Sequence, residues 1–126
     1  MTLVLDAGAF IAVERGERDV IALIKLERLA DRPPRTHGGV VAQVWRGGRG
    51  RQVAIARLLP GVDTVPLDEA LGRRAGALMG QSETTDAIDA ALVCLADDGD
   101  LVLTSDVGDL RLLSETSGTH IELIPV

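Results

Sequence analysis

The sequence is poor in aromatic residues, because Phe10 and Trp45 are the only two and there is no tyrosine. Proteins that bind single-stranded nucleic acid without sequence preference stack successive bases on aromatic side chains, so a surface of that kind is excluded. Cys94 is the only cysteine, which excludes an internal disulfide and a thiolate metal site. Its apolar surroundings, ALVCLA, predict a buried structural thiol rather than a nucleophile.

Long apolar runs and targeting signals are also missing. No run reaches the roughly 20 apolar residues that a membrane-spanning helix needs. The first residues, MTLVLDAGAF, have neither the basic start nor the cleavage site of a secretory signal. We therefore expect no membrane association and a cytoplasmic location. His37 and His120 lie too far apart to suggest a zinc site of the usual spacing.

The net charge of the 126-residue chain is −6, which at first argues against a nucleic-acid partner. Positive charge nevertheless gathers at Arg46, Arg49, Arg51 and Arg57, while aspartates gather in the second half. A site that holds divalent cations has this appearance, because the metal supplies the positive charge that a phosphate needs. Charge alone leaves open an ordinary acidic protein.

Short runs rich in leucine and β-branched residues alternate with longer segments of helical spacing, over a length that suits a single domain. The expected strands are Thr2 to Leu5, a weak one at Val62 to Val65, Leu101 to Thr104, and Ile121 to Ile124. The expected helices are Glu17 to Ala30, Val40 to Trp45, Gln52 to Leu59, Asp68 to Met79, Thr85 to Ala96 (capped by Thr84 or Thr85), and Val107 to Ser114. This alternation predicts one α/β domain over residues 1–126, a three-layer α/β/α fold around a mostly parallel sheet.

Two aspartates follow expected strands. Asp6 comes directly after the first strand, and Asp106 follows the strand that ends at Thr104. Open parallel sheets form ligand sites outside the carboxyl ends of their strands, where the strand order reverses, so the two acids can converge. Either aspartate alone is better explained as a helix cap, whereas the pair favours a site.

The segment TTDAIDAALVCLA adds two more acids. Asp86 and Asp89 are three residues apart and share one face if both lie on the helix. Asp86 could instead complement the helix dipole. Asp89 lies deeper in a close-packed segment, where an unpaired carboxylate is costly unless a cation compensates it. Asp109 could add an outer oxygen or cap the last helix, and Thr104 could support the ligands by hydrogen bonding.

Carboxylate oxygens without histidine or cysteine select Mg²⁺ or Mn²⁺. Such ions can activate water and stabilise the leaving oxygen of a phosphodiester, and either one or two ions would suit this set of acids. No protein nucleophile stands beside the aspartates, so metal-activated water is the expected attacking group.

The motifs VLDAGAFIA, VVAQVWRGG, DAALVCLA and LTSDVGDL, in this order, resemble the PIN-domain family, and in particular the VapC toxins of bacterial toxin–antitoxin modules. The resemblance implies a metal-dependent endoribonuclease whose acids map to Asp6, Asp89 and Asp106. The second family acid, usually a glutamate, falls on Gln43, which keeps an oxygen acceptor but has no charge. Asp86, one turn before Asp89, could replace that charge.

The same resemblance implies an RNA substrate, a VapB-like antitoxin that inserts a segment into the acidic groove, and a homodimer. We expect Arg46, Arg49 and Arg51 to contact RNA phosphates. Two other classes remain open. One is a PIN-like module, disabled by Gln43, that binds RNA or an antitoxin without cleaving. The other, a phosphoacceptor or phosphatase with Asp6 as nucleophile, is disfavoured because Gly8 stands where a second acid is needed and the only lysine, Lys25, is inside a helix.

Overall fold

Five short strands form one sheet in the computed structural model, which describes residues 1–126. Every pair of neighbouring strands is parallel. The strands are β1 (Leu3–Leu5), β2 (Arg35–His37), β3 (Asp63–Val65), β4 (Leu101–Thr104) and β5 (Glu122–Pro125). The expectation of a mostly parallel sheet is therefore confirmed, and the sheet has no antiparallel strand at all.

The strand order is β3-β2-β1-β4-β5. The chain moves outward from β1 through β2 to β3 and then crosses back to the other side of β1 for β4 and β5. The order consequently reverses between β1 and β4, which pair with Leu5 opposite Leu103. In sheets of this type the crevice outside the carboxyl ends of these two strands is the usual place for a ligand.

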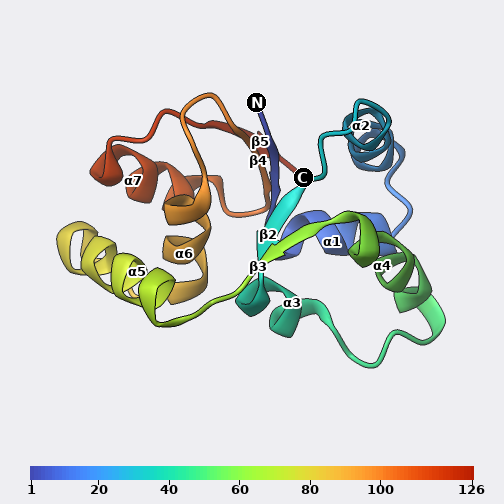
Figure 1. The fold of residues 1–126 in the computed structure, drawn as a ribbon, viewed down its shortest axis with the longest axis horizontal. Coiled ribbons are helices and arrows are strands. Elements are labelled where there is room, and N and C mark those ends of the chain that lie inside the picture. Colours follow the sequence, from blue (N-terminus) through green and yellow to red (C-terminus); the bar gives the residue numbers. More distant parts are fainter.

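Helices cover both faces of the sheet, which confirms the three-layer α/β/α fold (Figure 1). One layer holds α1 (Ala7–Glu14), α2 (Arg18–Leu29) and α4 (Val53–Leu58), with α3 (Gly38–Val44) near the carboxyl end of β2. The other layer holds α5 (Glu69–Ser82), α6 (Ala87–Leu95) and α7 (Val107–Ser117). Two short 3₁₀ turns, Gly50–Gln52 and Leu59–Gly61, flank α4. None of the helices has the length and hydropathy needed to cross a bilayer.

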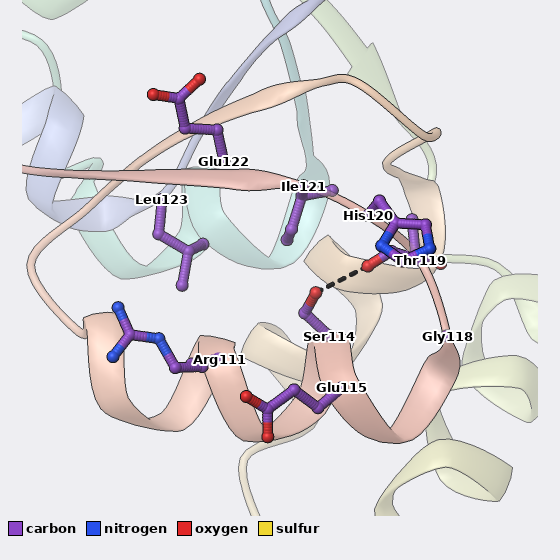
Figure 2. Close-up of a pocket in the computed structure, with 9 residues that line it drawn as sticks. All are labelled: Arg111, Ser114, Glu115, Gly118, Thr119, His120, Ile121, Glu122 and Leu123. Atoms are coloured by element: carbon purple, nitrogen blue, oxygen red, sulfur yellow. Dashed lines mark hydrogen bonds between the residues drawn. The ribbon is translucent and has the colours of Figure 1, made fainter.

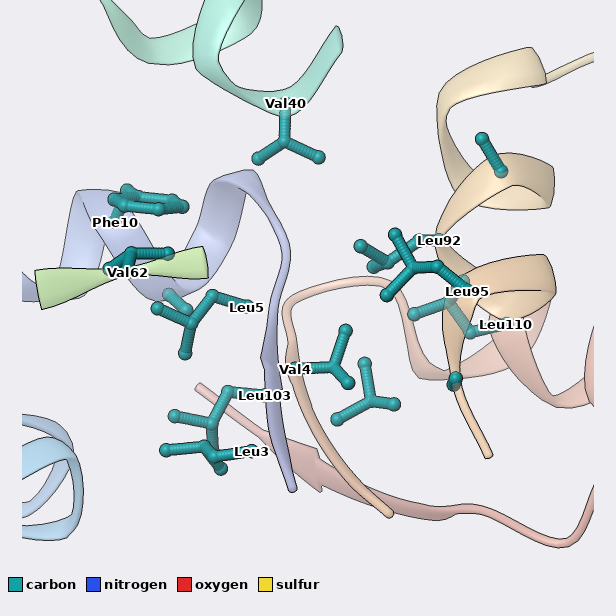
Figure 3. Close-up of a cluster of buried hydrophobic side chains, with 14 of the residues drawn as sticks. Leu3, Val4, Leu5, Phe10, Val40, Val62, Leu92, Leu95, Leu103 and Leu110 are labelled. Carbon is teal, nitrogen blue, oxygen red and sulfur yellow. The ribbon is translucent and has the colours of Figure 1, made fainter. Parts of the chain in front are cut away.

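The central strands supply side chains to two apolar layers (Figure 3). Side chains alternate across a strand, so Leu3 and Leu5 point toward α1 while Val4 points toward α6 and α7. All three are fully buried. Because β1 is covered on both faces, its sequence is a continuous apolar run rather than an alternating one.

Sequence patterns missed two elements, β2 and α1. Arg35–His37 has only three residues, two of them basic, so nothing in its composition indicates a strand; its pairing between β1 and β3 creates it. Helix α1 is apolar on nearly every side and buries Ala9, Phe10, Ala12 and Val13. A helix without a polar face has no amphipathic period to detect.

The other helices lie within a few residues of their expected bounds, with one informative shift. Helix α6 begins at Ala87 instead of Thr85, and its N-cap is Asp86 rather than Thr84 or Thr85. Cys94, expected to be buried, is partly exposed on this helix. Burial and the apolar surroundings raise the pKa of its thiol, as expected for a structural rather than a nucleophilic cysteine.

Candidate functional site

Three aspartates gather at the carboxyl edge of the sheet. Asp89, Asp106 and Asp109 each offer a carboxylate oxygen, and these three oxygens lie within 4.8 Å of one another. Asp89 comes from α6, Asp106 from the end of β4, and Asp109 from the first turn of α7. The sheet topology therefore unites Asp89 and Asp106, as the sequence predicted, and adds Asp109 as a full member of the group.

Asp106 occupies the N-cap position of α7, yet its side chain makes no capping hydrogen bond. Its backbone N–H instead donates to the buried hydroxyl of Thr104, over 2.8 Å, which holds the chain at this bend. The carboxylate of Asp106 is consequently not committed to the helix. Thr104 thus has the supporting position that the sequence suggested for it.

Asp89 is the most constrained acid of the group. The residue is 9% exposed, and its Oδ2 atom is buried without any hydrogen-bond partner. The pKa of Asp89 is raised to about 7, chiefly by burial and in addition by the charge of Asp86, the hydrogen bond and charge of Asp106, and the charge of Asp6. A buried carboxylate oxygen without a partner is costly, and a bound cation would remove that cost.

Asp6 borders the cluster but is engaged elsewhere. Its buried carboxylate accepts hydrogen bonds from the backbone N–H groups of Ala9, at 3.1 Å, and Ser105, at 3.3 Å. It is thus the N-cap of α1, and its oxygens are not among the three that lie within 4.8 Å. Burial raises its pKa, while hydrogen bonds from Thr104 and the backbone act in the opposite direction. The helix-cap alternative considered for Asp6 is realised, and its charge still reaches Asp89.

Gly8 permits this close arrangement of β1 and β4. A Cβ atom at Gly8 would lie 2.7 Å from the Cβ of Ser105 and 2.9 Å from its backbone nitrogen. Any larger residue would push the start of α1 away from the end of β4. The glycine that argues against a phosphoacceptor mechanism in the sequence therefore has a packing role.

Asp86 caps α6 and does not share a helical face with Asp89, because it lies outside the helix. One of its oxygens accepts hydrogen bonds from the N–H groups of Ile88 and Asp89, each at 3.0 Å. Asp86 is not among the three gathered acids, although its charge raises the pKa of Asp89. The third acid of the group is instead Asp109, whose pKa is raised mainly by the charge of Asp106.

Gln43 is exposed on α3. It lies one helical turn after Gly39, whose Cα faces the side chain of Ile88 at the start of α6. Gln43 therefore lies on the side of α3 that faces the helix of Asp89.

Arg46, Arg49 and Arg51 are exposed on the loop after α3. The buried side chain of Gln52 organises this glycine-rich loop. The Gln52 carbonyl accepts hydrogen bonds from the N–H groups of Arg46, at 2.6 Å, and Gly48, at 3.2 Å, and its amide donates to Val44. The three arginines are thus presented on a loop that is tied to the end of α3.

His37 is a residue that sequence reasoning set aside. It is fully buried at the end of β2, and both of its ring nitrogens are hydrogen bonded. Nδ1 accepts from the N–H of Gly39, which makes His37 the N-cap of α3. A histidine directly before Gly38-Gly39 is the only sequence signal for this role, and it is a weak one.

A cavity of about 660 Å³ lies elsewhere, between the end of α7 and the start of β5 (Figure 2). It is lined by charged and polar side chains that include Arg111, Glu115 and His120. Helix α7 runs back from the carboxyl edge, so the cavity lies at the opposite edge of the sheet from the aspartates. It takes no part in the acidic site.

No protein-family model matches the sequence, and no curated protein matches it.

Proposed function

We propose that this protein is a divalent-metal-dependent endoribonuclease of the PIN-domain type, similar to VapC toxins. The observation that carries the proposal is the buried, unpartnered Oδ2 of Asp89 in a group of three aspartates at the strand-order reversal. The proposal of RNA as substrate and of a toxin–antitoxin context comes from the resemblance of VLDAGAFIA, DAALVCLA and LTSDVGDL to that family.

The donor set suits Mg²⁺ or Mn²⁺. Asp89, Asp106 and Asp109 offer only hard oxygen ligands, which these ions prefer. When bound, such an ion supplies a lowered water pKa and charge stabilisation for phosphodiester hydrolysis. The charge of Asp6, next to Asp89, adds to the negative potential that attracts the cation.

The protein's own residues have separable roles in this proposal. Asp89, Asp106 and Asp109 hold the cation, and Thr104 fixes the backbone of Asp106. Arg46, Arg49 and Arg51 bind the phosphates of the RNA on either side of the scissile bond, because exposed guanidinium groups pair well with phosphate. A VapB-like antitoxin and a second copy of the chain are the partners that the resemblance implies.

A module that binds RNA without cleaving it is the second candidate, and Gln43 is the residue that favours it. An uncharged amide replaces a carboxylate of the family pattern, which would weaken metal binding. Asp109 restores the third carboxylate within 4.8 Å of the others, so the structure favours the catalytic alternative.

The test is cleavage of a single-stranded RNA oligonucleotide by the metal-free protein before and after addition of Mn²⁺, with a DNA oligonucleotide of the same sequence in parallel. We expect metal-dependent cleavage of the RNA, lost in Asp89→Asn and Asp106→Asn. Asp68→Asn is the matched control, because Asp68 caps α5 and is not one of the three gathered acids. RNA binding without cleavage would establish the second candidate, and absence of Mn²⁺ binding in a calorimetric titration would refute the metal site.

A further inference from the structure

The start of α6, which carries Asp89, is tied to β2 by a single buried side chain. His37 Nε2 lies 2.9 Å from the carbonyl oxygen of Ile88, the residue directly before Asp89. His37 and Ile88 are 51 positions apart in the sequence. Asp86 also restrains this turn, but it belongs to the same segment and cannot set the position of the helix relative to the sheet.

The hydrogen bonds of His37 determine its tautomer. Nδ1 accepts from the N–H of Gly39, at 3.0 Å, and must therefore be unprotonated. The proton consequently resides on Nε2, which donates to Ile88. Burial lowers the pKa of His37, which keeps the ring neutral. One side chain thus caps α3 with one nitrogen and holds α6 with the other.

The residues around the hydrogen bond from His37 to Ile88 are closely packed. A Cβ atom at Gly39 would lie 2.5 Å from Cδ1 of Ile88 and 2.8 Å from Cε1 of the His37 ring. The first turn of α3 therefore packs against both Ile88 of α6 and the His37 ring. This close contact is possible because Gly39 has no side chain. A movement of either turn would displace Asp89.

We propose that His37 is a positioning residue for the metal site, acting through its Nε2 hydrogen bond to Ile88 to hold Asp89 beside Asp106 and Asp109. This inference rests on the proposed metal-dependent function. A buried hydrogen-bond donor that orients the chain of a ligand residue has the same physical role as the outer partners of known metal ligands, whose removal lowers metal affinity roughly 10–100-fold.

Two near-isosteric variants separate this role from helix capping. In His37→Asn the amide oxygen replaces Nδ1, so the cap on α3 is kept and the bond to Ile88 is lost. In His37→Gln the amide nitrogen replaces Nε2, so the bond to Ile88 is kept and the cap is lost. His120→Gln is the matched control, because His120 is exposed and lies by the cavity at the opposite edge of the sheet.

The measurements are the Mn²⁺ affinity of the metal-free protein by calorimetric titration and the thermal midpoint in EDTA. We expect His37→Asn to bind Mn²⁺ about 10–100-fold more weakly than wild type, and His37→Gln to bind more tightly than His37→Asn, whichever variant is more stable. Wild-type affinity in His37→Asn, or binding by His37→Gln that is no tighter than binding by His37→Asn, overturns the role of His37. A wild-type protein that binds no Mn²⁺ refutes the metal site itself and this inference with it.

Discussion

At the scale of the residue, Asp89 combines burial with a cluster of like charges. Carboxylates that approach one another in a partly buried site resist ionisation, because each new charge is poorly solvated and repelled by its neighbours. A divalent cation reverses that balance, so the same groups that destabilise the free protein favour the bound one. The destabilisation that ionised Asp89 causes in the metal-free protein can therefore be measured without any substrate.

The substitution Asp89→Asn should stabilise the metal-free protein at alkaline pH. The pKa of Asp89 is about 7 in the folded protein, against an ordinary value of 3.8. Between these two pH values the folded state binds more protons than the unfolded state, so stability falls as the pH rises. The ionised carboxylate of Asp89 therefore lowers the stability of the folded protein to its full extent above pH 7 and not at all below about pH 4. Asn cannot ionise, so the variant does not lose this stability.

Thermal unfolding in EDTA at pH 8 and at pH 4 tests this. We expect the midpoint of Asp89→Asn to exceed that of wild type by a few degrees at pH 8, and the two midpoints to approach each other at pH 4. A lower midpoint for the variant at pH 8 would show that the carboxylate has a compensating partner. Asp68→Asn again serves as the control, because the Asp68 carboxylate is exposed.

At the scale of the element, three helices around the site begin with an aspartate, and the three aspartates are used differently. Asp6 and Asp86 cap α1 and α6 with their side chains, whereas Asp106 stands before α7 without a capping hydrogen bond. A cap commits a carboxylate oxygen to backbone N–H groups. The presence or absence of a capping hydrogen bond at each helix N-terminus therefore indicates which of these carboxylates remain available to a ligand.

Asp86 can be tested as a cap by two substitutions. Asp86→Ala removes both hydrogen bonds to the start of α6 and should cost about 0.5–2 kcal/mol of stability. Asp86→Asn keeps the cap and removes only the charge, so it should cost little stability. Chemical denaturation measures both effects.

Activity then decides between a cap and a ligand. If Asp86 acts only as a cap, Asp86→Asn should retain cleavage that Asp106→Asn loses. Loss of cleavage in Asp86→Asn would restore Asp86 as a ligand, and partial rescue by Gln43→Glu would support the idea that the two positions share a charge requirement.

At the scale of the whole molecule, acidic and basic side chains form separate groups. The chain has a net charge of −6, and the acidic cluster lies at the carboxyl edge of the sheet. Arg46, Arg49 and Arg51 follow α3, the helix whose first turn contacts α6. The negative net charge would repel a polyanionic substrate, so the proposed function requires that RNA binding depend on these few arginines and on the cation.

Replacing Arg46, Arg49 and Arg51 by alanine should therefore weaken RNA binding across different sequences and flatten its dependence on salt. The slope should fall by about one unit for each phosphate that no longer has an arginine partner. Fluorescence anisotropy of a labelled RNA at several salt concentrations measures the slope. The control changes the same charge at exposed arginines on other helices, Arg18, Arg73 and Arg111. Equal slopes in the two triple variants would remove the loop from the binding surface.

Much of the architecture follows from local sequence patterns. The alternation of apolar strands with amphipathic helices specifies an α/β fold, because a parallel sheet needs helices on both faces to bury its strands. Strand ends mark Asp6 and Asp106, and the placement of Asp89 in a close-packed helix marks it as costly. These signals are local, since each depends on residues within a few positions of one another.

Only the tertiary structure decides which of the acids meet. Asp109 joins the cluster and Asp6 borders it because the register of β1 and β4, the close approach at Gly8 and the start of α7 fix their relative positions. Strand β2 exists only through its neighbours, and the bond from His37 to Ile88 spans 51 positions. Sequence periodicity reports how one element buries its own apolar face. The relative placement of elements depends instead on hydrogen bonds and packing between segments that are distant in the chain, and no local pattern encodes them.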